Sequence, residues 1–262
     1  MMLLERKYIN ILKSVVSREI SAKYKGTVFG AVWNIINPLF MLLIYSTVFL
    51  HVFKARWEIG NNEYADYALM LFIGIITHIF MSEVLSGATA VIRNNSHIVK
   101  KIVFPLEILP VTVVLVAALN FMIGIVLTLI YSISMGYINA PLNLLFIPII
   151  IGVYVTTLLA LSYFFSSISV YVRDVQQVIP VVSLVLLFTS TVFFSIRTAP
   201  DSLGAILYIN PISIIADALR ESIYTESVSW HRLLSLFLIS SVMLVFFYKI
   251  YNKLKLGFTD VL

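Results

Sequence analysis

His78 and Glu83 lie five positions apart in the sequence, and their imidazole and carboxylate groups are of the kinds that bind metals and transfer protons. A separation of five residues on one helix, however, places them about 140° apart, which is poor geometry for a shared metal ion or a proton relay. Glu83 is the stronger functional candidate, because an ionisable group deep inside a long apolar stretch is costly. Alternatively, a neighbouring hydroxyl group in a helix bundle caps Glu83, and its role is structural.

The sequence lacks the motifs of nucleotide hydrolysis and of common hydrolytic enzymes. It contains no G-x-x-x-x-G-K-[ST] segment, so we expect that this chain does not hydrolyse ATP by itself. H-E-x-x-H and G-x-S-x-G segments are also absent, and we expect no catalytic residues and no bound metal. With no cysteine, neither disulfides nor thiol-ligated metals can form.

A charged connector, RNNSHIVKKIVFPLEILP (93–110), separates two long apolar stretches. Its polar side chains are Arg93, Asn94, Asn95, His97, Lys100 and Lys101. The two asparagines can cap the start of a short helix, and Pro105 and Pro110 restrict the path of the chain after it. Taken alone, the connector is either a rigid element that binds a partner or a topology signal that contacts nothing.

Composition indicates an integral membrane protein. Of the 262 residues, 60% are hydrophobic and only 12% are charged, about half the charge of a soluble domain. Uncharged stretches long enough to cross a bilayer recur along the chain, and MGYINAPLN (135–143) divides the longest of them with a turn. We therefore predict an all-α membrane protein with six transmembrane helices, at 31–53, 66–90, 108–133, 142–170, 176–195 and 232–251.

The distribution of basic residues predicts the orientation. With six spans, both termini and the loops after the second and fourth spans share one side, and that side carries 13 of the 18 Lys and Arg residues. The positive-inside rule places this side, and both termini, in the cytoplasm.

Two further segments differ from the spans. Residues 1–25 form an amphipathic helix by periodicity, predicted to lie on the cytoplasmic membrane surface as an interface helix or as a simple topology anchor. Residues 196–230 contain apolar runs too short to span, broken at Asn210 and Pro211, with Asp217 three residues before Arg220. This pattern favours a re-entrant helical hairpin between spans five and six, with an ordinary outer loop as the alternative, and a local ion pair.

Four segments, in order, carry a resemblance to a known family. They are REISAKYKGTVFGAVWNIINPLFMLLIYSTVF (18–49), NNSHIVKKIVFPLEILP (94–110), VRDVQQVIP (172–180) and NPISIIADALR (210–220). Together they resemble the type-2 ABC transporter permeases of the polysaccharide-export branch, which includes Wzm- and KpsM-type permeases and teichoic-acid exporters. The resemblance extends over nearly the whole chain, so 26–262 is expected to form one transmembrane domain.

The resemblance implies a homodimeric channel in the bacterial inner membrane, with two separate ATPase subunits that bind ATP and Mg. It implies that the loop at 91–107 contains the coupling helix, so that Arg93, Asn94, Asn95, His97, Lys100 and Lys101 contact the ATPase. The interface helix is expected to meet the ATPase through Arg18, Glu19, Lys23, Tyr24 and Lys25. Arg173 and Asp174 are expected to form a buried or partner-facing ion pair. In the outer segment the matched residues are Asn210, Pro211, Asp217 and Arg220.

The implied cargo is a lipid-linked polysaccharide, such as O-antigen, capsule or teichoic acid, within membrane lipid, and no nucleic acid is expected. Tyr45, Phe80 and Tyr163 are candidate channel-lining residues because aromatic rings stack on sugars, although packing is the commoner role of such rings. Glu83 is a further candidate because a carboxylate inside the membrane is costly. Three alternatives are an exporter of drugs or small lipids, a membrane-embedded lipid-modifying enzyme, and an ion-coupled transporter. The first predicts a larger outer domain or different connector motifs, which the sequence does not show, and no polar catalytic cluster or internal repeat supports the other two.

Overall fold

The computed structural model describes residues 6–26, 29–48, 63–101, 104–138, 141–196, 201–225 and 228–262. Every regular element in these ranges is a helix, which confirms the all-α class. The α-helices are α1 (Arg6–Tyr24), α2 (Trp33–Thr47), α3 (Glu63–Asn94), α4 (Ser96–Lys101), α5 (Ile108–Ser134), α6 (Ile147–Tyr171), α7 (Val175–Phe188), α8 (Asp201–Ile209), α9 (Pro211–Tyr224), α10 (Trp230–Leu254) and α11 (Phe258–Val261). Short 3₁₀ turns precede α2 and α6 and join α10 to α11.

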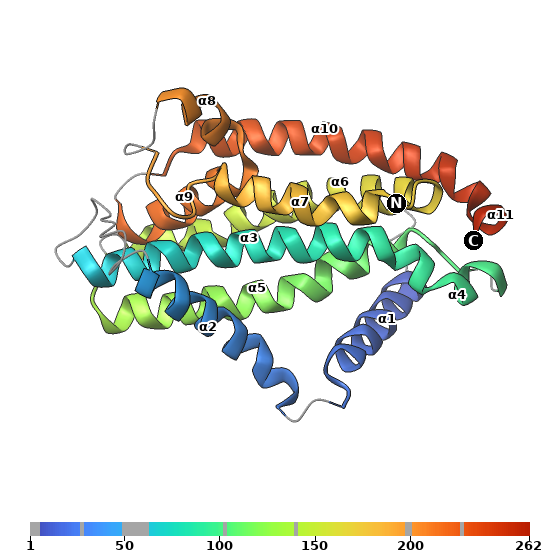
Figure 1. Cartoon of the computed structure of the whole chain (residues 1–262), viewed down its shortest axis with the longest axis horizontal. Coiled ribbons are helices and arrows are strands. Elements are labelled where there is room, and N and C mark those ends of the chain that lie inside the picture. Colours follow the sequence, from blue (N-terminus) through green and yellow to red (C-terminus); the bar gives the residue numbers. More distant parts are fainter. Residues whose placement is uncertain are drawn as a thin grey trace.

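The long helices run along one axis with α3 at the centre (Figure 1). α3 packs against α5, α6, α7 and α9, and α6 packs most extensively against α10. Of the apolar stretch of α3, 72% is buried within the chain, against 17% for α10, so α3 is the core helix and α10 a peripheral one. α1 and α2 project from the bundle, and the end of α1 and the start of α2 approach each other away from it, so that the two helices form a V (Figure 1). α4 and α11 lie at one end of the bundle, and α8 and α9 lie at the other (Figure 1).

Polar side chains inside the bundle bond to backbone carbonyls, as an apolar surrounding requires. Tyr154 of α6 donates to the carbonyl of Thr77 in α3 at 2.7 Å, and Ser162 donates to that of Pro110 in α5 at 2.9 Å. Phe80, Phe121 and Tyr154 pack as three rings between α3, α5 and α6. These contacts fix the register of the three central helices.

Four helical segments of the described residues are long and apolar enough to cross a membrane: Tyr67–Asn94, Ile108–Ser134, Pro141–Tyr171 and Trp230–Val261. They coincide with four of the six predicted spans, so the chain is a multi-pass membrane protein. The predicted span at 176–195 corresponds to α7, with 14 residues, shorter than the about 20 residues that a span needs. The predicted span at 31–53 contains α2, with 15 residues, and residues 49–53 of this span lie outside the described residues. The count of six is therefore not established by the helices themselves.

The predicted span at 176–195 ends early, at Phe188, because the next residues fold onto α9. Asn210 donates to the carbonyls of Leu186 and Thr189, each at 3.0 Å, and so satisfies carbonyls at the end of α7. The backbone N–H of Thr191 then donates to Ser213 in α9. Residues 189–196 are thereby bound to the α9 surface instead of extending the helix.

The predicted break at Asn210 and Pro211 is confirmed. α8 ends at Ile209 and α9 begins at Pro211, whose missing N–H and fixed φ suit the first position of a helix. The side chain of Asn210 accepts a hydrogen bond from the N–H of Ile212 at 2.9 Å, which is an N-cap. The same side chain therefore ends α7 and starts α9.

Candidate functional site

The connector between α3 and α5 contains the short helix α4, and Asn95 joins it to two other helices. The Asn95 side chain donates to the carbonyl of Val91 in α3 and accepts from Arg18 of α1 at 2.8 Å. Its backbone carbonyl accepts from the N–H groups of Ile98 and Val99 at the start of α4. The sequence predicts that the Asn95 side chain caps α4. Instead, its backbone carbonyl accepts the first hydrogen bonds of α4, and its side chain joins α1 to the end of α3.

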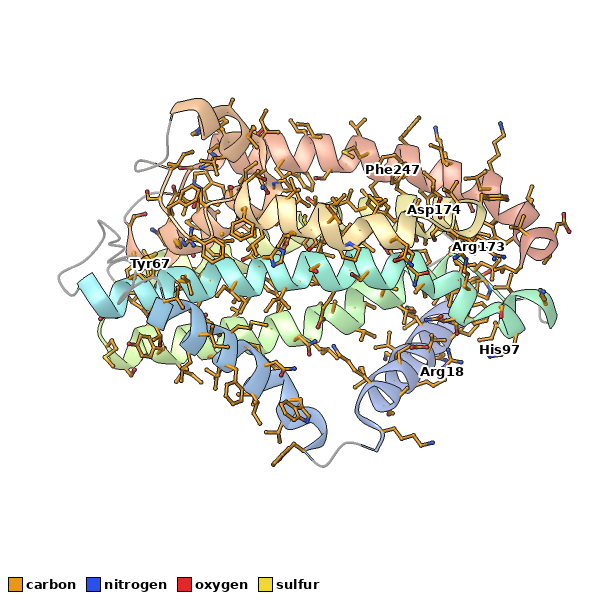
Figure 2. The ribbon with its side chains drawn as sticks, in the orientation of Figure 1. Arg18, Tyr67, His97, Arg173, Asp174 and Phe247 are labelled. Atoms are coloured by element: carbon orange, nitrogen blue, oxygen red, sulfur yellow. The ribbon has the colours of Figure 1, made fainter. Side chains whose placement is uncertain are left out.

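α4 has one buried and one exposed face. Ile98 and Val99 are buried, and Val99 belongs to an apolar cluster with Tyr251 and Phe258 of the C-terminal region. His97 and Lys100 are exposed, and Figure 2 shows His97 at the extremity of the bundle. A helix seated in this way presents its basic side chains outward without being free to move independently. The side chain of Lys101 lies outside the described residues.

Arg93 and Asn94 of the predicted coupling set lie in different surroundings from His97 and Lys100. Arg93 turns toward α6 and donates to the carbonyl of Ser169, so its charge stabilises the bundle end. Asn94 is exposed and lines the cavity described below. Arg173 and Asp174, in the turn between α6 and α7, are both exposed at the same end (Figure 2), which makes the buried form of their predicted ion pair wrong.

The exit of the connector is bonded to α6 and to the C-terminal region. Tyr251 of α10 donates to the carbonyl of Leu106 at 2.7 Å, and Tyr163 of α6 donates to that of Glu107 at 3.1 Å. The ammonium group of Lys255 pairs with the carboxylate of Glu107. The sequence does not predict that Tyr251 and Lys255 contact the connector, because they lie about 145 residues from their partners and carry no motif.

Glu83 lies at a junction between α1, α3 and α5. Its carboxylate accepts from Asn120 of α5 at 3.0 and 3.1 Å and pairs with Lys23 of α1 at 3.2 Å. Among the described residues, its partners are therefore a neighbouring amide and a lysine, and no hydroxyl group caps it. A cavity of about 400 Å³ opens here, lined by Val15, Glu19, Lys23, Glu83, Val113 and Ala117, among other residues.

The interface helix α1 is amphipathic as predicted. Val15 is buried, whereas Lys13, Arg18 and Lys25 are exposed. Glu19 pairs with Arg18 at 2.9 Å on the exposed face, a type of pair that adds at most about 1 kcal/mol. The side chain of Tyr24 lies outside the described residues.

The candidate channel-lining residues separate into two groups. Phe80 is 1% exposed and Tyr163 is 3% exposed, both in the interior of a single chain. A ring in that position packs the bundle and does not face a surface that a second copy or a cargo could reach. Glu83, on the cavity, is the member of the set that is accessible, and the side chain of Tyr45 lies outside the described residues.

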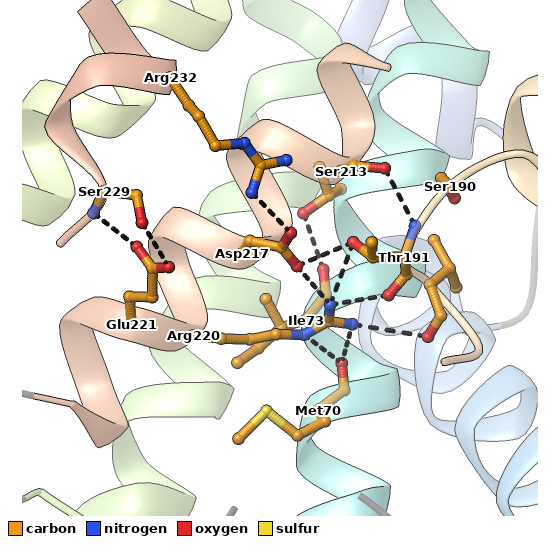
Figure 3. A network of polar contacts seen from close by, with 12 residues as sticks. Met70, Ile73, Ser190, Thr191, Ser213, Asp217, Arg220, Glu221, Ser229 and Arg232 are labelled. Atoms are coloured by element: carbon orange, nitrogen blue, oxygen red, sulfur yellow. Dashed lines mark hydrogen bonds and ion pairs between the residues drawn. The ribbon is translucent and has the colours of Figure 1, made fainter. Parts of the chain in front are cut away.

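The predicted ion pair of Asp217 and Arg220 is confirmed, with a separation of 3.1 Å, and it belongs to a larger buried cluster (Figure 3). Arg220 donates through Nε and Nη2 to the carbonyl of Met70 in α3 and through Nη1 to that of Thr191. Arg232 of α10 pairs with the other oxygen of Asp217 at 3.2 Å. Burial lowers the pKa of the Arg220 guanidinium, and adjacent Asp217 acts in the opposite direction.

Gly74 allows this cluster to approach α3. A Cβ at this position would lie 2.8 Å from Nη2 of Arg220 and 2.9 Å from Cα of Val192. Glu221, one residue after Arg220, binds the N–H and hydroxyl groups of Ser229 with its two oxygens and so fixes the start of α10 (Figure 3). The cluster therefore joins α3, α9, α10 and the segment after α7.

Comparison with known proteins defines the class. A family model described as ABC-2 type transporter matches residues 11–224, and the chain belongs to this family. Among curated relatives, the O-antigen export system permease protein RfbA of Myxococcus xanthus is 26% identical over 208 residues, which cover 79% of this chain and 77% of the relative. Two Klebsiella pneumoniae proteins of the same name are 23% and 20% identical over 253 residues, covering 97% of this chain and 95% of each relative. The chain is thus a type-2 ABC permease of the polysaccharide-export branch.

Proposed function

We propose that this chain is the permease subunit of an ABC exporter that moves a lipid-linked polysaccharide, with O-antigen as the first candidate, across the bacterial inner membrane. Two copies form the channel, and two separate ATPase subunits bind ATP and Mg and supply the work. The names of the relatives support the choice of O-antigen over capsule or teichoic acid.

The observation that carries the proposal is the construction of α4. Its apolar face is fixed to the bundle, and its exit is bonded to α6 and α10, while His97 and Lys100 face outward. A partner that displaces α4 would therefore displace the bundle as well. In the proposed mechanism the bundle has two states, and ATP bound to the partner changes their balance through α4.

The proposed topology has six spans with both termini in the cytoplasm. α2 and α7 are the two additional spans, supported by the exposed apolar side chains on both helices, among them Phe40, Leu43, Val181 and Leu184. α8 and α9 form the re-entrant hairpin, supported by their short lengths of 9 and 14 residues and by the burial of α9 against α3. α1 lies along the cytoplasmic surface, where its basic residues face lipid headgroups or the ATPase.

The experiment is reconstitution of export. The chain is expressed with candidate ATPases in a strain that lacks its own O-antigen permease, and surface polysaccharide and co-purified ATPase are measured. Restored O-antigen together with a bound ATPase is the expected result. Export by the chain alone would contradict the proposal. Binding of an ATPase without export of O-antigen, capsule or teichoic acid would instead indicate an exporter of drugs or small lipids.

A further inference from the structure

The buried cluster around Asp217 contains two guanidinium groups, and they differ in how many of their nitrogens donate a hydrogen bond within the protein. Every nitrogen of Arg220 donates to an acceptor, namely the carbonyls of Met70 and Thr191 and the carboxylate of Asp217. Arg232 uses only Nη1, which donates to Asp217 at 3.2 Å. Over the part of the chain that the structure describes, its Nε and Nη2 are buried and have no acceptor.

The two unpaired nitrogens lie on one edge of the guanidinium. Nε and Nη2 direct their N–H bonds in parallel, which is the arrangement that binds the two oxygens of a carboxylate or a phosphate. The Arg232 side chain is 9% exposed, so these donors have lost water without gaining a partner in the protein. Buried donors without a partner are rare and indicate a water, an ion or a ligand.

The carboxylates of the cluster bond to other donors and do not reach the free edge of Arg232. Oδ1 of Asp217 accepts from Arg220 and Thr191, Oδ2 accepts from Nη1 of Arg232, and the two oxygens of Glu221 accept from Ser229. Among the described residues, neither carboxylate contacts Nε or Nη2 of Arg232, so an acceptor for this edge is expected to come from outside the cluster.

Tyr208 of α8 covers the guanidinium. Its ring centroid lies 4.8 Å from Cζ of Arg232, and its hydroxyl group contacts Nε2 of His231 at 3.0 Å. Tyr208 itself is 46% exposed, so a change in its rotamer or in the position of α8 would open a path from the surface to Arg232.

We propose that the Nε–Nη2 edge of Arg232, covered by Tyr208, is a binding site for an oxyanion of the phosphate or carboxylate class. The site lies at the end of the bundle that carries α8 and α9, far from α4 (Figure 1). The oxyanion belongs either to an anionic membrane lipid or to a charged group of the exported molecule. The second source rests on the proposed function, whereas the site itself does not.

The test uses the full-length chain in nanodiscs of phosphatidylcholine, without an ATPase, so that its outcome is independent of export. Inorganic phosphate and acetate are titrated and binding is measured by calorimetry. In a second arm, phosphatidylglycerol replaces part of the lipid and the thermal unfolding midpoint is measured. We expect saturable binding of phosphate or acetate, or a raised midpoint with phosphatidylglycerol. A raised midpoint with phosphatidylglycerol assigns the oxyanion to a lipid, whereas binding of phosphate or acetate without that response favours a charged group of the exported molecule.

Arg232→Lys keeps the charge and removes the paired donors, so we expect affinity to fall about tenfold or more, with Arg173→Lys as the control at an exposed position. Tyr208→Ala removes the ring that covers the guanidinium but none of the hydrogen bonds of Arg232, so we expect saturable binding to persist in this variant, which keeps the test decisive if the Arg232 variant misfolds. The proposal is overturned if the unaltered chain responds to none of the three probes. It is also overturned if the Arg232→Lys and Tyr208→Ala variants respond equally to the probe that the unaltered chain binds.

Discussion

The hydroxyl group of Tyr251 donates a 2.7 Å hydrogen bond to the carbonyl of Leu106, which joins the end of α10 to the last part of the connector between α3 and α5. The adjacent pair of Lys255 and Glu107 strengthens the same junction. Both contacts hold the connector exit against the bundle, so they are expected to determine how much of a displacement of α4 reaches the membrane helices.

Lys255→Glu places two carboxylates together at this junction and is expected to lower export about tenfold, as for a loss of about 1.4 kcal/mol in coupling. The matched control is Lys253→Glu, which makes the same charge change at an exposed position two residues earlier. The measurement is export per ATP hydrolysed in the reconstituted complex. Equal ratios in both variants would assign the pair to local stability alone.

Reversing the charge of Lys100 and Lys101 together to Glu is expected to weaken binding of the ATPase by about tenfold or more, because a basic surface that meets a partner loses its complementarity. Lys249→Glu, exposed on α10, serves as the control. Co-purification measures binding, and membrane insertion is checked in parallel. Undiminished binding by the double variant would remove α4 from the interface.

The pair of Lys23 and Glu83 is suited to a double-mutant cycle with Lys23→Met and Glu83→Gln. Both side chains are about one-third exposed, so the coupling free energy is expected to be small in detergent, about 0.5 kcal/mol. Glu83→Gln is expected to slow export if the movement of α1 depends on this contact. If export is unchanged while the cycle still shows coupling, the contact has a structural role only.

Gly74→Ala is expected to destabilise the fold by about 1–3 kcal/mol, because its Cβ would meet the backbone of Val192 and the guanidinium of Arg220. Gly152→Ala is the control: apart from the adjacent residues and backbone of its own helix, no atom lies within 4 Å of the added Cβ, and alanine favours a helix by up to about 1 kcal/mol over glycine. Unfolding midpoints of the two variants should therefore shift in opposite directions. A shared direction would contradict the packing described for α3 and α9.

Asp217→Asn removes the only carboxylate that contacts both Arg220 and Arg232 among the described residues. Two buried positive charges would then face each other without compensation, and a loss of about 3–5 kcal/mol is expected. Glu19→Gln, which removes an exposed carboxylate, should change stability by less than about 1 kcal/mol. Denaturant titration of both variants in detergent measures the difference, and similar losses would contradict the central role of Asp217.

Local features could be predicted from the sequence because each rests on a few neighbouring residues. The charged connector contrasts with the apolar stretches beside it, and the break at Asn210 and Pro211 follows from the chemistry of those two residues. The pair of Asp217 and Arg220 is separated by one helical turn, so its geometry is set within a single helix.

Contacts between helices could not be predicted in the same way. The partners of Glu83, namely Asn120 and Lys23, depend on how α1 and α5 cross α3, and no periodicity in the sequence reports crossing angles. For the same reason, the sequence predicts Phe80 and Tyr163 as channel-lining residues, whereas the structure buries both rings within the chain. Aromatic composition gives the number of rings but not the face on which each one lies.

α3 is continuous over 32 residues, a length of about 48 Å at 1.5 Å per residue. The carbonyl of its Met70 holds Arg220 near one extremity, and the other extremity leads through a single residue into α4. If α3 moves as a rigid body, a tilt of about 5° about one end shifts its other end by about 4 Å over this length. A displacement of α4 would therefore move the opposite end of α3 directly, because no flexible hinge interrupts the helix.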